Sequence, residues 1–347
     1  MNTDIRQKHT YIDYLRVTAS FAVIMIHTIA ENWGKVDVFS YQWKAYNFMD
    51  SIVRWCVPVF VMISGALFLN RQISIKRIYN KYLFRIFTAF IFWGIIYGLE
   101  KEGSFTVKFY KFLNGPSHFW YLTMLAGLYM CIPFFRAVIE DKKRVHYFLI
   151  LTLLFNFLVP SAISIIQDFG GSVINRLMGP FIQKMTLIDL SLVIGYSAYF
   201  ISGYFFSTTD FEKKQRVIIY FLGILGFAAT IFLSQAVTFK NGEPSDRYYG
   251  YLCTNVMMEA AAVFIWFKYR SYSNAKLNVI MNRMSKYSFG AYAVHVLILH
   301  QLNYRNILSS DAYPVLSSLG IGLITFVGSY LISALLNNIP FLKKYIV

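Results

Sequence analysis

Long apolar segments alternate with short polar ones along the whole chain of 347 residues. A helix that crosses a membrane needs about 20 mostly apolar residues. The pattern therefore predicts an all-α, polytopic membrane bundle of about ten transmembrane helices. The predicted spans are 12–30, 45–69, 80–99, 119–138, 146–166, 187–206, 216–237, 250–268, 287–304 and 313–338.

The composition supports a membrane protein. Hydrophobic residues make up 57% of the chain and charged residues 14%, whereas soluble domains have roughly 45–50% and about 25%. The net charge of +16 would suit nucleic acid, but a membrane protein collects basic residues in its cytoplasmic loops. We therefore expect membrane lipid around the bundle and no nucleic acid partner.

The loop charges also predict the orientation. Loops on the side of the N-terminus carry twenty Lys and Arg residues, and loops on the other side carry ten. Because the basic side is the cytoplasmic one, both termini are expected in the cytoplasm, in a multi-pass protein of the cell (cytoplasmic or inner) membrane. Residues 1–347 are expected to form a single integral membrane domain with no appended soluble domain.

One short motif occurs twice. "ISGALF" (63–68) and "ISGYFF" (201–206) both end a predicted span at the cytoplasmic face. The match is compatible with chance or with a parallel internal repeat of the kind that some transporters have.

The first span, "YIDYLRVTASFAVIMIHT", carries Asp13, Arg16 and His27. At about 100° and 1.5 Å per residue, eleven residues return a helix to within about 20° and advance it by roughly 16 Å. An ionisable group at membrane depth costs about 2.5–3.5 kcal/mol and normally faces the bundle interior. Arg16 and His27 are therefore predicted on one inward stripe, with Arg16 toward the cytoplasm and His27 toward the outside. The alternative is that Arg16 reaches lipid phosphates and His27 bonds a neighbouring helix.

Three more intramembrane charges are candidates. Asp50 and Arg54 lie four residues apart in the second span and are expected to pair, with a kink at Pro58 just below. A purely structural ion pair is the alternative. Glu259 in the eighth span is expected to pair with Arg54 or His295, or to be protonated.

Polar aromatic residues mark two further sites. His118 and Trp120 enter the fourth span from outside, where an acceptor or an interfacial aromatic belt would place them. Tyr292 and His295 are three residues apart and share a face of the ninth span. The alternative for His295 is a hydrogen-bonded core histidine.

These residue types suit acyl transfer. Cationic side chains such as Arg85 and Lys81, near the cytoplasmic face, could bind donor phosphates, although the positive-inside rule also explains them. Histidine is the natural general base for a hydroxyl near neutral pH. Such a pair fits transfer from a thioester such as acetyl-CoA. No Walker loop, GxSxG or HExxH motif is present in the sequence, and no metal is expected.

The motifs resemble those of the acyltransferase 3 family, in order and over nearly the whole chain. The first span is similar to the family's first helix, with its arginine, ten residues and then histidine. Further similar segments are "SIVRWCVPVFVMISGALF", "KYLFRIF", "SHFWYL" and "SKYSFGAYAVHVLILH".

This resemblance implies a membrane O-acyltransferase. It would move an acetyl or other short acyl group from cytoplasmic acyl-CoA to a hydroxyl of a cell-surface polysaccharide or lipid-linked glycan. By family analogy Arg16 and His27 are essential and Arg54 and Arg85 support donor binding, with His27 as the base. A carboxylate that orients His27 is left open among Glu31, Asp50 and Glu259, and so is a homodimer.

A membrane transporter is the alternative function. Charged groups on several spans would equally line a path for a glycan precursor or a small polar substrate.

Overall fold

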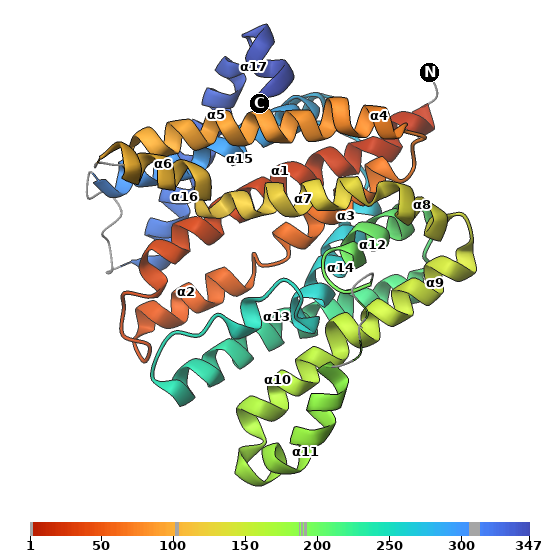
Figure 1. The fold of residues 1–347 in the computed structure, drawn as a ribbon, viewed down its shortest axis with the longest axis vertical. Helices are drawn as coiled ribbons and strands as arrows, with labels where there is room; N and C mark the ends of the chain where they lie inside the picture. The colour runs from red at the N-terminus through yellow and green to blue at the C-terminus, as the bar shows by residue number, and fades with distance from the viewer. Residues whose placement is uncertain (1–2, 101–103, 187, 189, 191–192, 305–312) are drawn as a thin grey trace. The chain divides into compact units, whose positions relative to one another are not determined.

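The computed structural model describes residues 3–100, 104–186, 188, 190, 193–304 and 313–347. Every regular element within these ranges is a helix (Figure 1), which confirms the all-α prediction. The chain divides into two compact units. The first unit contains Met1–Thr28, Arg71–Phe134 and Ser271–Val347, and the second contains Ile29–Asn70 and Phe135–Arg270. The single domain over 1–347 stays a prediction.

The first unit contains most of α1 and the helices that follow residue 71. They are α1 (Thr3–Trp33), α4 (Ile75–Arg77), the π-helix η1 (Ile78–Leu83), α5 (Phe84–Glu100), α6 (Phe105–Asn114), the 3₁₀ turn η2 (Ser117–Phe119), α7 (Trp120–Met130), α15 (Ala275–Tyr304), α16 (Pro314–Leu336) and α17 (Pro340–Tyr345).

The second unit contains the end of α1 and the middle of the chain, and α8 (Ile132–Ile139) crosses the boundary between the units. Its other elements are α2 (Tyr41–Ser51), α3 (Cys56–Phe68), α9 (Lys142–Leu151), the π-helix η3 (Thr152–Leu158), α10 (Val159–Phe169), α11 (Gly171–Thr186), α12 (Ser197–Thr208), α13 (Lys213–Asn241), the 3₁₀ turn η4 (Arg247–Tyr249) and α14 (Thr254–Lys268).

Seven helical stretches of the described residues are long and apolar enough to cross a membrane, or eight if the bent pair Phe105–Met130 and Ile132–Ile139 is one span. The multi-pass prediction is therefore confirmed, whereas the number ten stays a prediction. Two predicted spans fall on helices outside this set. The first, 187–206, begins partly outside the described residues and overlaps α12, which has only 12 residues. The second, 287–304, overlaps α15, which is 30 residues long but interrupted by polar side chains.

The second predicted span is broken. Helix α2 ends at Ser51 and α3 starts at Cys56, with four turn residues between them. Pro58 explains the position of the break, because proline has no N–H and its ring clashes with the carbonyl four residues earlier, that of Arg54. The predicted kink is thus realised as a gap one turn before Pro58.

The repeated "ISG" motif forms a helix contact within the second unit. A Cβ atom on Gly65 of α3 would lie 1.8 Å from the Phe200 carbonyl oxygen, and one on Gly203 of α12 would lie 1.9 Å from that of Met62. Gly65 thus faces Phe200, three residues before Gly203, and Gly203 faces Met62, three residues before Gly65. Small residues allow such close backbone approach in membrane helices, so the two copies of the motif pack on one another by the same contact.

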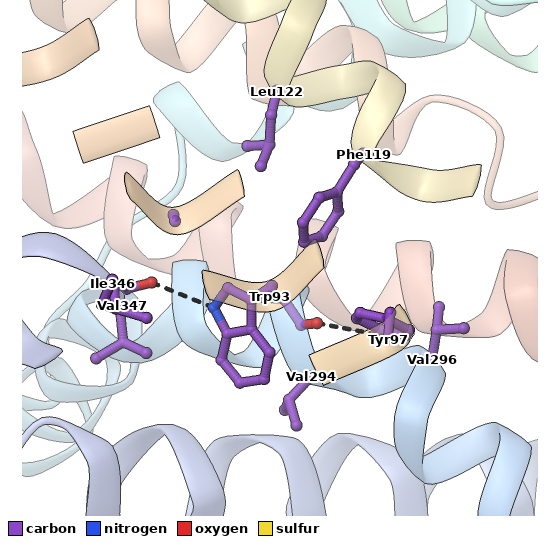
Figure 2. Close-up of a cluster of buried hydrophobic side chains, with 10 residues drawn as sticks. Trp93, Tyr97, Phe119, Leu122, Val294, Val296, Ile346 and Val347 are labelled. Carbon is purple, nitrogen blue, oxygen red and sulfur yellow. Dashed lines mark hydrogen bonds between the residues drawn. The ribbon is translucent and has the colours of Figure 1, made fainter. Parts of the chain in front are cut away.

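A buried aromatic core stabilises the first unit (Figure 2). Trp93 and Tyr97 of α5 pack with Phe119 and neighbouring aliphatic side chains. Tyr97 Oη donates a 3.0 Å hydrogen bond to the carbonyl of Ala293 in α15, and Trp93 Nε1 donates a 3.4 Å bond to the carbonyl of Ile346. Because His118 immediately precedes Phe119, this core also fixes α5 and α15 beside His118.

Candidate active site

Three histidines from separate parts of the sequence meet in the first unit. His27 comes from α1, His118 from η2 and His295 from α15. The ring centroids lie 5.0 Å apart for His27 and His295, 5.0 Å for His118 and His295, and 5.9 Å for His27 and His118. The structure therefore brings together three residues that the sequence singled out one by one.

Helix α15 positions α1 along its length. Tyr14 Oη donates to Asn278 Oδ1 at 2.8 Å, and Arg16 Nη1 donates to Ser285 Oγ at 3.1 Å. Farther along both helices, His27 meets His295. The partners advance in the same direction on both helices, so α1 and α15 run parallel where they touch.

Arg16 is half-buried near the middle of α1, eleven residues before His27. Asp13 lies within electrostatic range of Arg16, and its carboxylate accepts a 2.8 Å hydrogen bond from Asn282 Nδ2. The Asn282 and Ser285 side chains of α15 thus hold this acid–base pair by one bond each.

The chain turns sharply to place His118. Helix α6 ends at Asn114, and the next residue, Gly115, has a φ of 64°, in the region that favours glycine. The 3₁₀ turn η2 follows, with His118 buried at 2% exposure. Tyr292 Oη donates to the His118 backbone carbonyl. This bond fixes the backbone and leaves both ring nitrogens of His118 without a hydrogen-bond partner among the described residues.

His295 has a defined orientation. Its ring is fully buried, and Nδ1 lies 2.6 Å from the carbonyl oxygen of Tyr292. A carbonyl oxygen only accepts, so Nδ1 carries the hydrogen. In the neutral ring Nε2 then presents a lone pair, and within the described part of the chain Nε2 has no partner.

Three buried ring nitrogens of the cluster, both of His118 and Nε2 of His295, therefore have no hydrogen-bond partner among the described residues. Leaving a buried polar atom unsatisfied costs about 1–3 kcal/mol. Several buried nitrogens without hydrogen bonds, grouped beside His27, are typical of a site that binds a polar reacting group.

Comparison with known families shows which family the chain belongs to. The model of the acyltransferase 3 family, described as an acyltransferase domain, matches residues 9–337. The chain belongs to this family. It is a multi-pass membrane protein and an acyltransferase, as the sequence predicted. The curated proteins and the solved structures contain no match to it.

The acyltransferase carries two of its predicted donor-binding cations on neighbouring turns. Lys81 is exposed on η1, and Arg85 is half-buried near the start of α5. Arg85 Nη2 donates to the backbone oxygen of Val347, and the guanidinium lies 5.1 Å from the ring centroid of Phe289. Lys81 therefore offers the more accessible charge.

Trp120 opens α7 two residues after His118 and is 40% exposed. Its indole ring packs edge-on against Tyr121 at 6.3 Å. An exposed aromatic ring suits either the acceptor site or the interfacial belt that the sequence left open.

The acyltransferase has its predicted ion pair in the second unit. Arg54 Nη2 donates to Asp50 Oδ2, and this confirms the expected pairing. The guanidinium also lies 4.3 Å from the ring centroid of Tyr249. Arg54 and Asp50 therefore belong to a buried polar group of the second unit.

Glu259 has a partner that sequence reasoning missed. Its Oε1 accepts from Thr230 Oγ1 of α13, and Asn255 Nδ2 donates to the same hydroxyl at 2.8 Å. Arg54 lies within electrostatic range. A signal in the sequence for this contact is Gly226, one turn before Thr230 in α13. A Cβ on Gly226 would lie 2.6 Å from the Asn255 carbonyl oxygen, so glycine is what allows α13 to approach α14 at this point.

Tyr97, which lies near both His118 and the intramembrane His300, was not singled out from the sequence. The Tyr97 ring lies 5.5 Å from that of His118 and 6.5 Å from that of His300. His300 Nδ1 in turn lies 2.9 Å from Glu100 Oε2.

Within the described chain, no group of three or more His, Cys, Asp or Glu residues is arranged to hold a metal ion. Glu31 is half-buried one turn after His27 in α1.

Proposed function

We propose that this acyltransferase moves an acetyl or other short acyl group from cytoplasmic acyl-CoA to a hydroxyl of a cell-surface polysaccharide or lipid-linked glycan. The observation that carries the proposal is the cluster of half-buried His27 with buried His118 and His295, in which three ring nitrogens have no hydrogen-bond partner among the described residues. In a membrane acyltransferase, these atoms fit the two polar groups that react, a hydroxyl and an acyl carbonyl.

The cations of the chain fit an anionic donor. Arg16, Lys81 and Arg85 of the first unit would bind the phosphates of acyl-CoA, and Arg54 of the second unit is a further candidate. The donor supplies an acyl carbon activated by a thiolate leaving group.

His27 acts as the general base. It accepts the proton of the acceptor hydroxyl as that oxygen bonds to the acyl carbon. It returns the proton to the sulfur when the carbon–sulfur bond breaks, so protons balance over the cycle. A positioned base contributes about 10²–10⁴-fold to the rate of such a step.

Aromatic and carboxylate side chains suit the acceptor. Trp120 offers an exposed ring for a sugar face, and Tyr292 holds the backbone at His118. Within the second unit, taken by itself, Asp50 and Glu259 each have one buried carboxylate oxygen without a partner among the described residues. These oxygens are separate candidates to accept hydrogen bonds from sugar hydroxyls. We place this acceptor at the outer face of the inner membrane. A homodimer is compatible with the proposal.

Substitution of the base tests the proposal. We expect His27→Ala to lower transfer from labelled acetyl-CoA at least a hundredfold, and to remove the acetyl groups that mass spectrometry detects on surface polysaccharide. His146→Ala is the matched control, because His146 is exposed on α9 of the second unit, where its Nδ1 lies 2.6 Å from the carbonyl oxygen of Lys142 and its ring packs edge-on against Phe205. Normal acetate in the His27 variant, with unchanged protein in the membrane, would contradict the proposal.

The same measurement separates the enzyme from a transporter. A transporter of a glycan precursor would move its substrate without consuming acyl-CoA, and the label would stay on the donor.

A further inference from the structure

The ring of His118 is the least satisfied polar group of the histidine cluster. Both of its nitrogens are buried without a hydrogen-bond partner among the described residues. Whatever its charge, an imidazole ring carries at least one N–H. Burial of an N–H without an acceptor costs about 1–3 kcal/mol of free energy. The N–H of this ring can therefore donate a hydrogen bond to a group that binds beside it.

The ring is held without the use of its nitrogens. Three aromatic rings surround it, with centroids at 4.7 Å for Phe119, 5.3 Å for Tyr292 and 5.5 Å for Tyr97. The Tyr292 hydroxyl fixes the His118 backbone. The Ala293 carbonyl oxygen also lies near the ring. It accepts a hydrogen bond from Tyr97, and its second lone pair makes it a competing acceptor for the ring N–H, although no bond of normal geometry joins it to either nitrogen of His118. The ring is therefore held in a fixed orientation, and its N–H makes no hydrogen bond of normal geometry to a described residue.

The other two histidines of the cluster do not offer a free N–H for a hydrogen bond to the substrate. His295 uses its N–H on the Tyr292 carbonyl, so in its neutral form it shows only a lone pair to the cluster. His27 must also present a lone pair if it is the base. Acyl transfer needs a donor as well, because negative charge develops on the acyl oxygen.

We propose that His118 donates its ring N–H to the carbonyl oxygen of the acyl group and stabilises the charge that develops there. This inference rests on the proposed acyl-CoA donor and goes beyond it, since it assigns the oxyanion donor to a residue of η2. As the hydroxyl oxygen attacks, His27 takes the proton and the carbonyl electron pair moves to the oxygen. The N–H of His118 bonds more strongly to that oxygen until the carbon–sulfur bond breaks and the carbonyl forms again.

Binding of two inert donor analogues tests the hydrogen bond directly. In the first analogue a methylene group replaces the sulfur of acetyl-CoA, which leaves a methyl ketone. In the second, the carbonyl is replaced by methylene as well. We expect the purified full-length protein to prefer the ketone about fivefold, the value of one ordinary hydrogen bond. In His118→Ala the preference should fall to about one while the affinity for the second analogue is unchanged.

Two further variants complete the experiment. His118→Phe preserves the packing among aromatic rings and should lose the preference as His118→Ala does, so the test survives if the alanine variant does not fold. His300→Asn, in the same helix as His295 but paired with Glu100, should keep the full preference. Turnover of His118→Ala should fall by about 10²–10³, the usual cost of an oxyanion donor.

The outcomes separate the two proposals. An unchanged ketone preference in the alanine and phenylalanine variants would overturn the role of His118 and leave the acyl-CoA donor standing. It would then be the Ala293 carbonyl that receives the ring N–H. If neither analogue binds the wild-type protein, both proposals fail.

Discussion

At the scale of single residues, the Asp50–Arg54 pair is the interaction whose disruption should lower stability most clearly. Both side chains are largely buried, at 4% and 15% exposure. Removal of one partner from a buried ion pair leaves an uncompensated charge and costs about 3–5 kcal/mol. We therefore expect Asp50→Ala to destabilise the protein by about this amount, measured as a lower midpoint of thermal unfolding in detergent.

A double variant provides the control for this cost. Replacement of both partners, as in Asp50→Leu with Arg54→Met, removes the unpaired charge and is often close to neutral. The double variant should therefore unfold at a higher temperature than Asp50→Ala alone. Equal stability of the single variant and the wild type would show that Arg54 does not depend on Asp50.

The sequence predicted local relations between residues but not distant ones. The Asp50–Arg54 pair follows from a spacing of four, and the common direction of Arg16 and His27 follows from a spacing of eleven. The partner of Glu259 and the meeting of the three histidines depend on how separate helices pack. Spacing along one helix carries no information about that packing.

At the scale of helices, the contact between α3 and α12 depends on glycine. A Cβ on Gly65 or Gly203 would overlap a backbone carbonyl of the opposite helix. Since neither backbone can rotate away as a side chain could, the helices must separate. We expect Gly65→Ala and Gly203→Ala each to destabilise the protein by at least about 1–3 kcal/mol, seen as a lower unfolding temperature and lower yield in the membrane.

Gly127 is the matched control for these two variants. It also lies within a helix, α7, but a Cβ there would meet nothing within 4 Å. Gly127→Ala should leave stability unchanged or raise it, by about 0.5–1 kcal/mol from helix propensity alone. If all three alanine variants were equally stable, close approach at Gly65 and Gly203 would not hold α3 against α12.

Hydropathy predicted where helices occur better than how they are shaped. It gave one continuous span for 45–69, which is two helices, and one for 119–138, where the helices that meet at Cys131 are bent by 57°. A hydropathy window measures the length of an apolar segment and is insensitive to breaks within it. Proline lies near both breaks, because Pro58 follows the first gap and Pro133 comes two residues after Cys131, but only Pro58 was used as a signal.

At the scale of the whole molecule, the sequence established the class of protein but not the arrangement of its two units. Composition predicted a multi-pass membrane protein, and the ordered motifs predicted the family, because both signals are distributed along the entire chain. The orientation in the membrane rests on loop charge alone, which makes it the global prediction most in need of a direct test.

Cysteine labelling in intact cells tests the orientation. Lys35 and Lys143 are both exposed in loops or at helix starts, and the charge bias places Lys35 outside and Lys143 in the cytoplasm. In a background where Cys56, Cys131 and Cys253 are replaced by alanine, a membrane-impermeant maleimide should label Lys35→Cys in intact cells. Lys143→Cys should be labelled only after lysis. The reverse pattern would invert the bundle and place His27 nearer the cytoplasm than Arg16, which would remove the physical basis for a cytoplasmic donor at Arg16.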